Sequence, residues 1–273
     1  MMVDLDGRRV FVHTGGGPSD VEGSRVVLVH GAGMDHTVWR YQTRALAHSG
    51  RVAYAVDLPG HGRSEGEPLP DIEAVGGWLI GLLDRLEVAR AVLIGHSMGS
   101  FAVLQASTVA PDRIEGLILL GSGYAMPVHP ALMEAAIAGD HLAVELIVAW
   151  SHTGLGRFGS DADPGSWQQG AGARILERGL DRSLAVDLQA CHGYAAGAIA
   201  ASVTVPTWII IAADDRMTPP AAAHRLLEAI PGAVGSTVPA GHFALLDCPR
   251  LVQVEIVKGL EHFESGARTA VRG

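Results

Sequence analysis

The stretch VLIGHSMGSFAVL, residues 92–104, joins a run of apolar, partly β-branched residues to a pattern typical of a helix. Ser97 stands at the junction, with Gly95 two positions before it and Gly99 two positions after it. A serine at such a turn projects clear of the sheet and lies beside backbone N–H groups that lack helical acceptors and favour negative charge. Small residues are needed on both sides because the strand and the helix nearly touch. The stretch therefore predicts a nucleophile elbow, Gly-x-Ser-x-Gly.

Short apolar segments alternate along the chain with segments whose apolar residues recur at helical spacing, as between Ile72 and Leu86. This alternation is typical of a parallel sheet buried on both faces. The sequence therefore predicts an α/β fold with a mostly parallel central sheet of about eight strands and helices on both faces. The expected strands are 3–5, 9–13, 26–29, 52–56, 91–94, 114–120, one within 205–215, and 234–238, and the expected helices are 37–49, 72–86, 98–109, 221–230 and 249–263.

The interval 124–202 breaks the alternation, because it holds helix-like patches and turns rich in Gly, Asp and Pro without a convincing strand. At about 80 residues it exceeds a normal crossover, and we expect a helical cap over the ends of the strands. Two or three helices packed on the sheet are the alternative. The expected division is a first core part at 1–123, the cap at 124–202, a second core part at 203–263 and a tail without order at 264–273.

Composition and charge narrow the classes of partner. The chain of 273 residues carries a net charge of −9 and no basic stripe, so nucleic acid is not expected. No segment reaches the roughly 18 apolar residues of a membrane span, and the amino terminus does not read as a signal peptide. Cys191 and Cys248 are too few for a disulfide framework and fit reduced thiols in a cytoplasmic protein. The oligomeric state stays open, and a homodimer is compatible with the sequence.

A serine hydroxyl needs a base, usually histidine, and that histidine needs a carboxylate to orient it. The stretch PAGHFALLDCP places His242 after an expected strand, in a loop that leads into the last helix. Upstream, IIIAADDRMTPP places Asp214 and Asp215 at the carboxyl end of another strand. The order Ser, Asp, His along the chain is the order that an elbow-type hydrolase requires.

Four ordered motifs now resemble those of α/β-hydrolase-fold enzymes. They are HGAG at 30–33, DLPGHGRS at 57–64, GHSMGS at 95–100, and DDRMTPP at 214–220 followed by GHF at 241–243. Together they are specific for the superfamily and not for a substrate. One departure is Ala212, where relatives often have Gly.

The resemblance implies a catalytic set. Ser97 is the expected nucleophile, His242 the base, and Asp215 rather than Asp214 the acid, since Asp215 stands three residues before the threonine of Thr-Pro. The backbone N–H groups of Met98 and Ala32 are the expected oxyanion donors, with Gly33 as the alternative to Ala32. His30 and His96 are expected to brace the loop and the elbow.

Ser97 at the elbow also narrows the reaction, because dehalogenases and epoxide hydrolases of this fold carry Asp there. The expected activity is that of a serine carboxylesterase acting on small to medium apolar esters. A carbon–carbon bond hydrolase, a lactonase, a perhydrolase and a ligand receptor on the same scaffold are the alternatives. An apolar lid is expected from part of the set Leu132, Met133, Ile137, Leu142, Leu146, Ile147 and Trp150, the rest packing between helices.

No metal and no cofactor are expected. His36 and His61 are candidate metal ligands, but nothing in the sequence pairs them with carboxylates at the spacing of a metal site. Gly31, Gly33, Gly60 and Gly62 form neither a dinucleotide-binding fingerprint nor a phosphate-binding loop.

Overall fold

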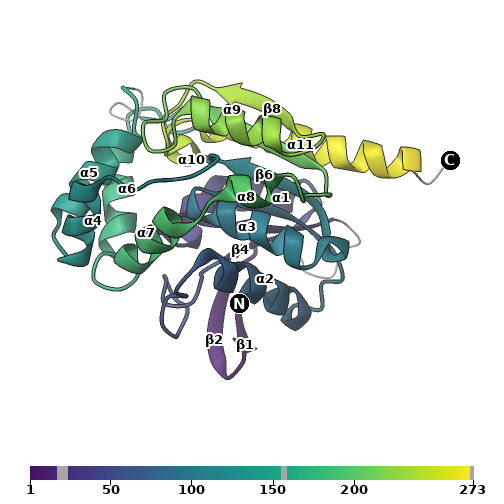
Figure 1. The fold of residues 1–273 in the computed structure, drawn as a ribbon, viewed down its shortest axis with the longest axis horizontal. Coiled ribbons are helices and arrows are strands. Elements are labelled where there is room, and N and C mark those ends of the chain that lie inside the picture. Colours follow the sequence, from purple (N-terminus) through teal and green to yellow (C-terminus); the bar gives the residue numbers. More distant parts are fainter. Residues whose placement is uncertain (17–23, 155–158, 271–273) are drawn as a thin grey trace.

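The computed structural model describes residues 1–16, 24–154 and 159–270. Within this part, one eight-stranded sheet with the order β1-β2-β4-β3-β5-β6-β7-β8 forms the centre of the molecule (Figure 1). The pairs β1–β2 and β2–β4 are antiparallel, and every later pair is parallel. The prediction of a mostly parallel sheet of about eight strands is therefore confirmed. The strands are Met2–Leu5, Arg8–His13, Arg25–Val29, Val52–Val56, Ala91–His96, Ile114–Leu120, Thr207–Ala212 and Val234–Val238, in the order β1 to β8.

Two apolar cores lie on the two faces of the sheet. Along β3, Val27 and Val29 belong to one core, while Val26 and Leu28 belong to the other. This alternation follows from the period of two along a strand and explains why the central strands are apolar throughout. The helices that cover the sheet are α1 Arg40–His48, α2 Ile72–Arg85, α3 Met98–Val109, α8 Ala196–Ala200, α9 Pro220–Ala229, α10 Ala244–Asp247 and α11 Pro249–Ala270. The first core packs against α2, α3, α8 and α9, and the second packs against α1, α10 and α11.

The segment between β6 and β7 is helical, as predicted. It contains α4 Pro130–Ile137, α5 Leu142–Ser151, α6 Gln168–Glu177, α7 Leu184–Gly193 and α8 Ala196–Ala200. Helices α4 to α7 gather at one end of the molecule (Figure 1), whereas α8 packs on the sheet layer beside α3 and α9. Among the described residues of this segment, the only β pairing is an isolated bridge between Gly159 and Pro164.

Two helix boundaries differ from the expectation. The helix expected at 37–49 begins as a 3-10 turn, His36–Trp39, which Asp35 caps through its side chain. The last helix was expected to end at 263, with an unordered tail from 264, but α11 runs to Ala270. Phe263 is buried in the core near the end of the chain. The helix continues past it because residues 264–270 contain no proline and because Arg51 forms an ion pair with Glu264 at 3.1 Å. Residues 271–273 lie outside the described residues.

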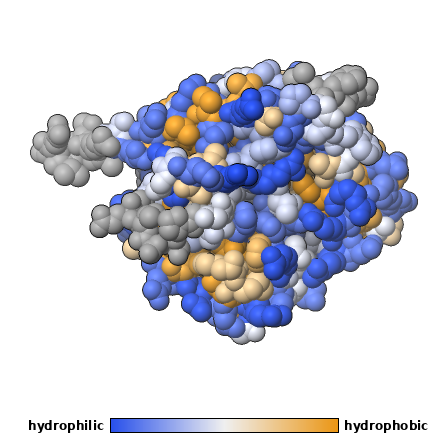
Figure 2. Space-filling model, turned by 180° about the vertical axis from the view of Figure 1, so that it is seen from behind, coloured by the Kyte–Doolittle hydropathy of each residue, from blue (hydrophilic) through white to orange (hydrophobic). Residues whose placement is uncertain are grey.

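The face seen in Figure 2 is largely hydrophilic, with apolar side chains in small separate patches. Among the described helices, none combines the length and the apolar character that crossing a membrane requires.

Candidate active site

The elbow that the sequence predicts is present between β5 and α3. Ser97 has φ 54° and ψ −120°, a strained conformation that costs about 1–3 kcal/mol. A Cβ on Gly95 would lie 2.2 Å from the carbonyl oxygen of Gly99, and a Cβ on Gly99 would lie 2.3 Å from that of Val29. Both positions must therefore be glycine. The helix begins at Met98, so the Met98 N–H belongs to a first turn whose donors have no acceptor within the helix.

The structure pairs His242 with Asp215 and not with Asp214. His242 Nδ1 lies 2.8 Å from Asp215 Oδ2, and both side chains are buried. Asp215 Oδ1 also accepts from the N–H groups of Met217 and Thr218, each at 2.8 Å. The side chain of Asp214 is exposed, and its N–H donates to Ala240.

These contacts keep Asp215 ionised. Burial alone would raise the pKa of the Asp215 carboxyl. The charge of His242 and hydrogen bonds from His242 and Thr218 outweigh burial and hold this pKa below its ordinary value. Thr218 Oγ1 donates to Asp215 Oδ2 at 2.8 Å and lies 3.2 Å from His242 Nδ1. Asp215 is therefore a fixed negative charge that orients the His242 ring.

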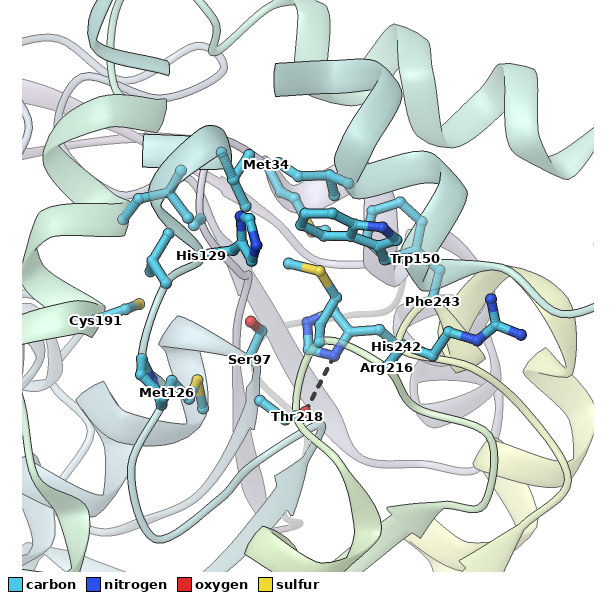
Figure 3. Close-up of a pocket in the computed structure, with 17 residues that line it drawn as sticks. Met34, Ser97, Met126, His129, Trp150, Cys191, Arg216, Thr218, His242 and Phe243 are labelled. Carbon is cyan, nitrogen blue, oxygen red and sulfur yellow. Dashed lines mark hydrogen bonds between the residues drawn. The ribbon is translucent and has the colours of Figure 1, made fainter. Parts of the chain in front are cut away.

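Ser97 and His242 meet at one cavity of about 120 Å³ (Figure 3). Figure 3 shows both side chains facing this cavity from different elements, Ser97 from the elbow and His242 from the loop after β8. Ala32 also lines the cavity, and so do several apolar side chains, among them Met34, Met126, Leu132, Ile147, Trp150 and Leu188.

His96 supports the loop that carries His242. Its Nε2 donates to the His242 carbonyl oxygen at 2.9 Å, and the two ring centroids are 4.9 Å apart. Burial lowers the pKa of His96 to about 3, so this ring is neutral at physiological pH. As expected from the sequence, His96 braces the elbow. Likewise His30 is fully buried, has a pKa lowered to about 4 by burial, and accepts from the Leu58 N–H at 3.2 Å.

The loop at 31–34 packs directly on the elbow. A Cβ on Gly31 would lie 3.1 Å from Ser97 Cβ, and Met34 N–H donates to Gly31 O at 3.2 Å. The Gly33 N–H donates to Asp187 Oδ2 at 2.7 Å. This donor is therefore already engaged, which removes Gly33 as the alternative to Ala32 for binding an oxyanion.

Asp187 reaches this loop from α7 and forms a buried ion pair with His61. Its Oδ2 lies 2.7 Å from His61 Nε2, while His61 Nδ1 lies 2.9 Å from Pro59 O. A carboxylate and a carbonyl only accept, so both ring nitrogens of His61 donate and the ring is charged. Burial alone would lower the pKa of His61, but the charge of Asp187 and its hydrogen bond raise this pKa overall.

We expect Asp187→Ala to destabilise the protein by about 3–5 kcal/mol at pH 6, because it breaks the buried ion pair with His61 and leaves the Gly33 N–H without an acceptor. Urea unfolding at pH 6 and pH 9 measures this loss. The raised pKa of His61 means that the stabilisation is complete below the unfolded value of about 6.5 and is lost as the pH rises through the folded value. The difference from the native chain is therefore smaller at pH 9.

The control is Asp181→Ala, which removes an exposed aspartate six residues away and should change the stability by less than about 0.5 kcal/mol. Equal effects of the two changes at pH 6 would contradict a special role for the Asp187 contacts.

The expectation that His36 and His61 lack carboxylate partners is wrong. Asp57 Oδ1 lies 2.8 Å from His36 Nδ1, and Asp187 pairs with His61. Sequence reasoning missed these pairs because the partners are 21 and 126 residues apart. No pattern of neighbouring residues in the sequence predicts these two pairs.

In the described part of the chain, one cluster has the spacing to hold a metal ion, namely Asp35, His36 and Asp57. Its carboxylates are already engaged. Asp57 Oδ2 accepts from the Arg63 N–H at 2.9 Å, and Asp35 Oδ2 pairs with Arg178 at 2.6 Å. These contacts give the cluster a role in fixing the loops after β3 and β4.

Sequence reasoning also missed a third His–Asp pair, whose side chains are buried. His152 Nδ1 lies 2.6 Å from Asp247 Oδ1. Next to it, the Phe243 N–H donates to Ser151 O at 3.0 Å. The end of α5 therefore holds the chain that directly follows His242. The 95 residues between His152 and Asp247 leave no pattern in the sequence.

Comparisons with known proteins agree with this architecture. The sequence matches the model of the alpha/beta hydrolase family over residues 26–254. It is 36% identical over 98 residues to an epoxide hydrolase of Caballeronia sordidicola, which is 35% of this chain and 30% of the relative. The chain spans between 21% and 30% of the length of the first curated relatives that it matches.

Among solved structures, the enol-lactonase from Burkholderia xenovorans LB400 is similar, with a TM-score of 0.84, 22% identity and coverage of 97% of this chain and 100% of that chain. A thermophilic esterase from Thermogutta terrifontis has a TM-score of 0.82 and 21% identity, covering 96% of this chain and 98% of the esterase. At these identities the likeness shows a common fold. Since the family model extends over most of the sequence, the protein belongs to the alpha/beta hydrolase family.

Proposed function

We propose that the protein is a serine hydrolase that cleaves carboxylic esters of small to medium apolar substrates through an acyl-enzyme intermediate. The observation that carries this proposal is the buried His242–Asp215 pair, in which His242 lines the same cavity as the strained Ser97. Nucleophilic acyl transfer requires a serine and a histidine at one site, with an ionised carboxylate hydrogen-bonded to the histidine.

In the proposed reaction, Ser97 Oγ attacks the acyl carbon while His242 Nε2 takes the hydroxyl proton. The negative charge on the carbonyl oxygen is stabilised by the N–H groups of Ala32 and Met98, each worth roughly 3 kcal/mol in the transition state. His242 then gives its proton to the departing alcohol. A water molecule repeats the sequence on the acyl-enzyme, releasing the acid and restoring Ser97. Asp215 holds His242 in the required orientation throughout.

We also propose that the helical segment within 124–202 acts as a cap on a core made of 1–123 and 203–263. Of the seven apolar residues weighed for a lid, Leu132, Ile147 and Trp150 line the cavity. Met133 and Leu146 pack in the second core, and Ile137 and Leu142 are exposed. The three lining residues give the cap an apolar inner wall.

Ester hydrolysis is favoured over epoxide opening because the elbow residue is Ser97. An epoxide hydrolase resembles part of the chain in sequence, but epoxide hydrolases of this fold carry Asp at that position. Lactones are internal esters and would follow the same steps, so the enol-lactonase likeness is compatible with the proposal.

The test is release of p-nitrophenol from acyl esters of increasing chain length. We expect turnover to be fastest with short acyl groups, because the cavity beside Ser97 is only about 120 Å³.

We expect EDTA to leave the rate of ester hydrolysis unchanged, because no step of the proposed reaction uses a metal. Loss of activity with EDTA would revive a metal mechanism. No turnover of any ester would place the carbon–carbon hydrolase and receptor alternatives ahead of the proposal.

A further inference from the structure

A wider groove of about 860 Å³ adjoins the cavity that holds Ser97 and His242. The two share part of their walls, including His129, Trp150 and Arg216. The cavity is smaller than the roughly 300–1,000 Å³ of most ligand sites. A substrate whose ester group lies at Ser97 therefore extends its remaining part into the groove.

The charged side chains that line this groove are all basic. They are Arg216 and Arg225, and no Asp or Glu lines the groove in the described part of the chain. The surrounding protein is acidic, with 29 Asp and Glu against 20 Lys and Arg. The basic lining of the groove is therefore opposite to the charge of the whole chain.

Arg216 has the best position to bind a charged substrate group. It lines both the cavity and the groove, and its side chain is exposed. Figure 3 shows this side chain extending from beside His242 away from Ser97. Within the described residues it has no carboxylate partner, whereas other arginines do, namely Arg9, Arg51, Arg113, Arg174 and Arg178.

Arg225 lies on the wall of the groove, and the Tyr124 ring holds it there. Its guanidinium carbon is 4.6 Å from the centroid of this ring. The stacking leaves the edge of the guanidinium, where its N–H donors are, available to a ligand. Two guanidinium groups on one groove suit an anionic oxygen group, which arginine binds through paired N–H donors.

We propose that the natural substrates are esters whose part beside Ser97 is small and apolar and whose distal part carries an anionic oxygen group, a carboxylate or a phosphate, and that Arg216, assisted by Arg225, binds this group in the groove. The proposal rests on the ester hydrolysis proposed above. Because Arg216 extends away from Ser97, the anionic group is separated from the reacting carbonyl and belongs to the distal part of the substrate.

The test compares matched anionic and neutral esters. The carboxylate arm uses mono-p-nitrophenyl adipate and its methyl ester, and the phosphate arm uses butyryl glycerol 3-phosphate and monobutyryl glycerol. For each pair, kcat/KM is measured with the native chain, Arg216→Gln, and the double variant with Arg225→Gln. The control is Arg44→Gln, which removes the same charge from the exposed surface of α1, away from the groove.

We expect the native chain to prefer the anionic ester in one arm, and that arm identifies the group. Arg216→Gln should reduce the preference about fivefold, mainly through KM, since one exposed ion pair is lost. The double variant should reduce it further, and about 1 M salt should weaken it in the native chain. Arg44→Gln should leave it unchanged.

Two results would overturn the inference while leaving the proposed function intact. One is equal or poorer hydrolysis of both anionic esters relative to their neutral partners. The other is a preference that Arg216→Gln changes no more than Arg44→Gln does. Failure to cleave the neutral esters as well would instead overturn the proposed ester hydrolysis, and with it this inference.

Discussion

Replacing Ser97 by alanine should lower kcat for ester hydrolysis on the order of 10⁶-fold. The hydroxyl is the only group at the elbow that can form the acyl-enzyme, and alanine removes it without adding bulk. Alanine must adopt the same positive φ of 54° as the serine, so the elbow backbone has no new strain to relieve. The measurement is p-nitrophenol release by equal amounts of the native chain and the variant.

The control for this variant is Ser107→Ala on the same helix, α3. Ser107 is buried and donates to Leu104 O, so the change removes a similar side chain at a distance from the cavity. We expect full activity from it. Retention of more than a small fraction of the native rate by Ser97→Ala would show that another group attacks the ester.

Asp215→Asn should lower kcat about 10⁴-fold, whereas Asp214→Asn should change it little. An asparagine at 215 would lack the charge that stabilises protonated His242, and its amide N–H₂ would favour the wrong His242 tautomer. Asp214 is exposed, and no side-chain hydrogen bond from it to His242 is present in the described structure. The paired rates of the two variants therefore identify the acid.

The opposite ranking of these two variants would assign the acid to Asp214 and contradict the geometry. Circular dichroism and urea unfolding check that both variants fold. This check matters for Asp215, because its carboxylate also accepts from Met217 and Thr218 in the loop after β7. An asparagine retains one acceptor oxygen for these bonds, so loss of activity without loss of structure is the expected result.

The elbow and the loop that carries Asp215 could be predicted from the sequence because the contacts that fix them are mostly between residues close in sequence. Gly95 and Gly99 are required by contacts within a few residues and one neighbouring strand. Asp215 is fixed by Met217 and Thr218, only two and three positions later. Strand prediction also succeeded, because the central strands are buried on both faces and apolar throughout.

The contacts that hold the site from the helical segment could not be predicted in this way. Asp187 meets Gly33 across 154 residues, and Asp247 meets His152 across 95. Each pair forms only when α5 and α7 pack on the core, and no local sequence pattern predicts how these helices pack. Aspartate and histidine on helices are also commonly exposed, so their burial here becomes evident only from the packing.

The most direct test of the central claim is the location of a covalent adduct after treatment with a fluorophosphonate, which reacts with activated serines. Peptide mass spectrometry reads the result on the tryptic peptide 91–113, which contains Ser97, Ser100 and Ser107. We predict one adduct per chain, placed on Ser97 by fragmentation, with loss of esterase activity in step with labelling. Esterase activity that persists with Ser97 fully labelled, or that is lost with the adduct on another residue, would contradict the assignment of Ser97 as the nucleophile.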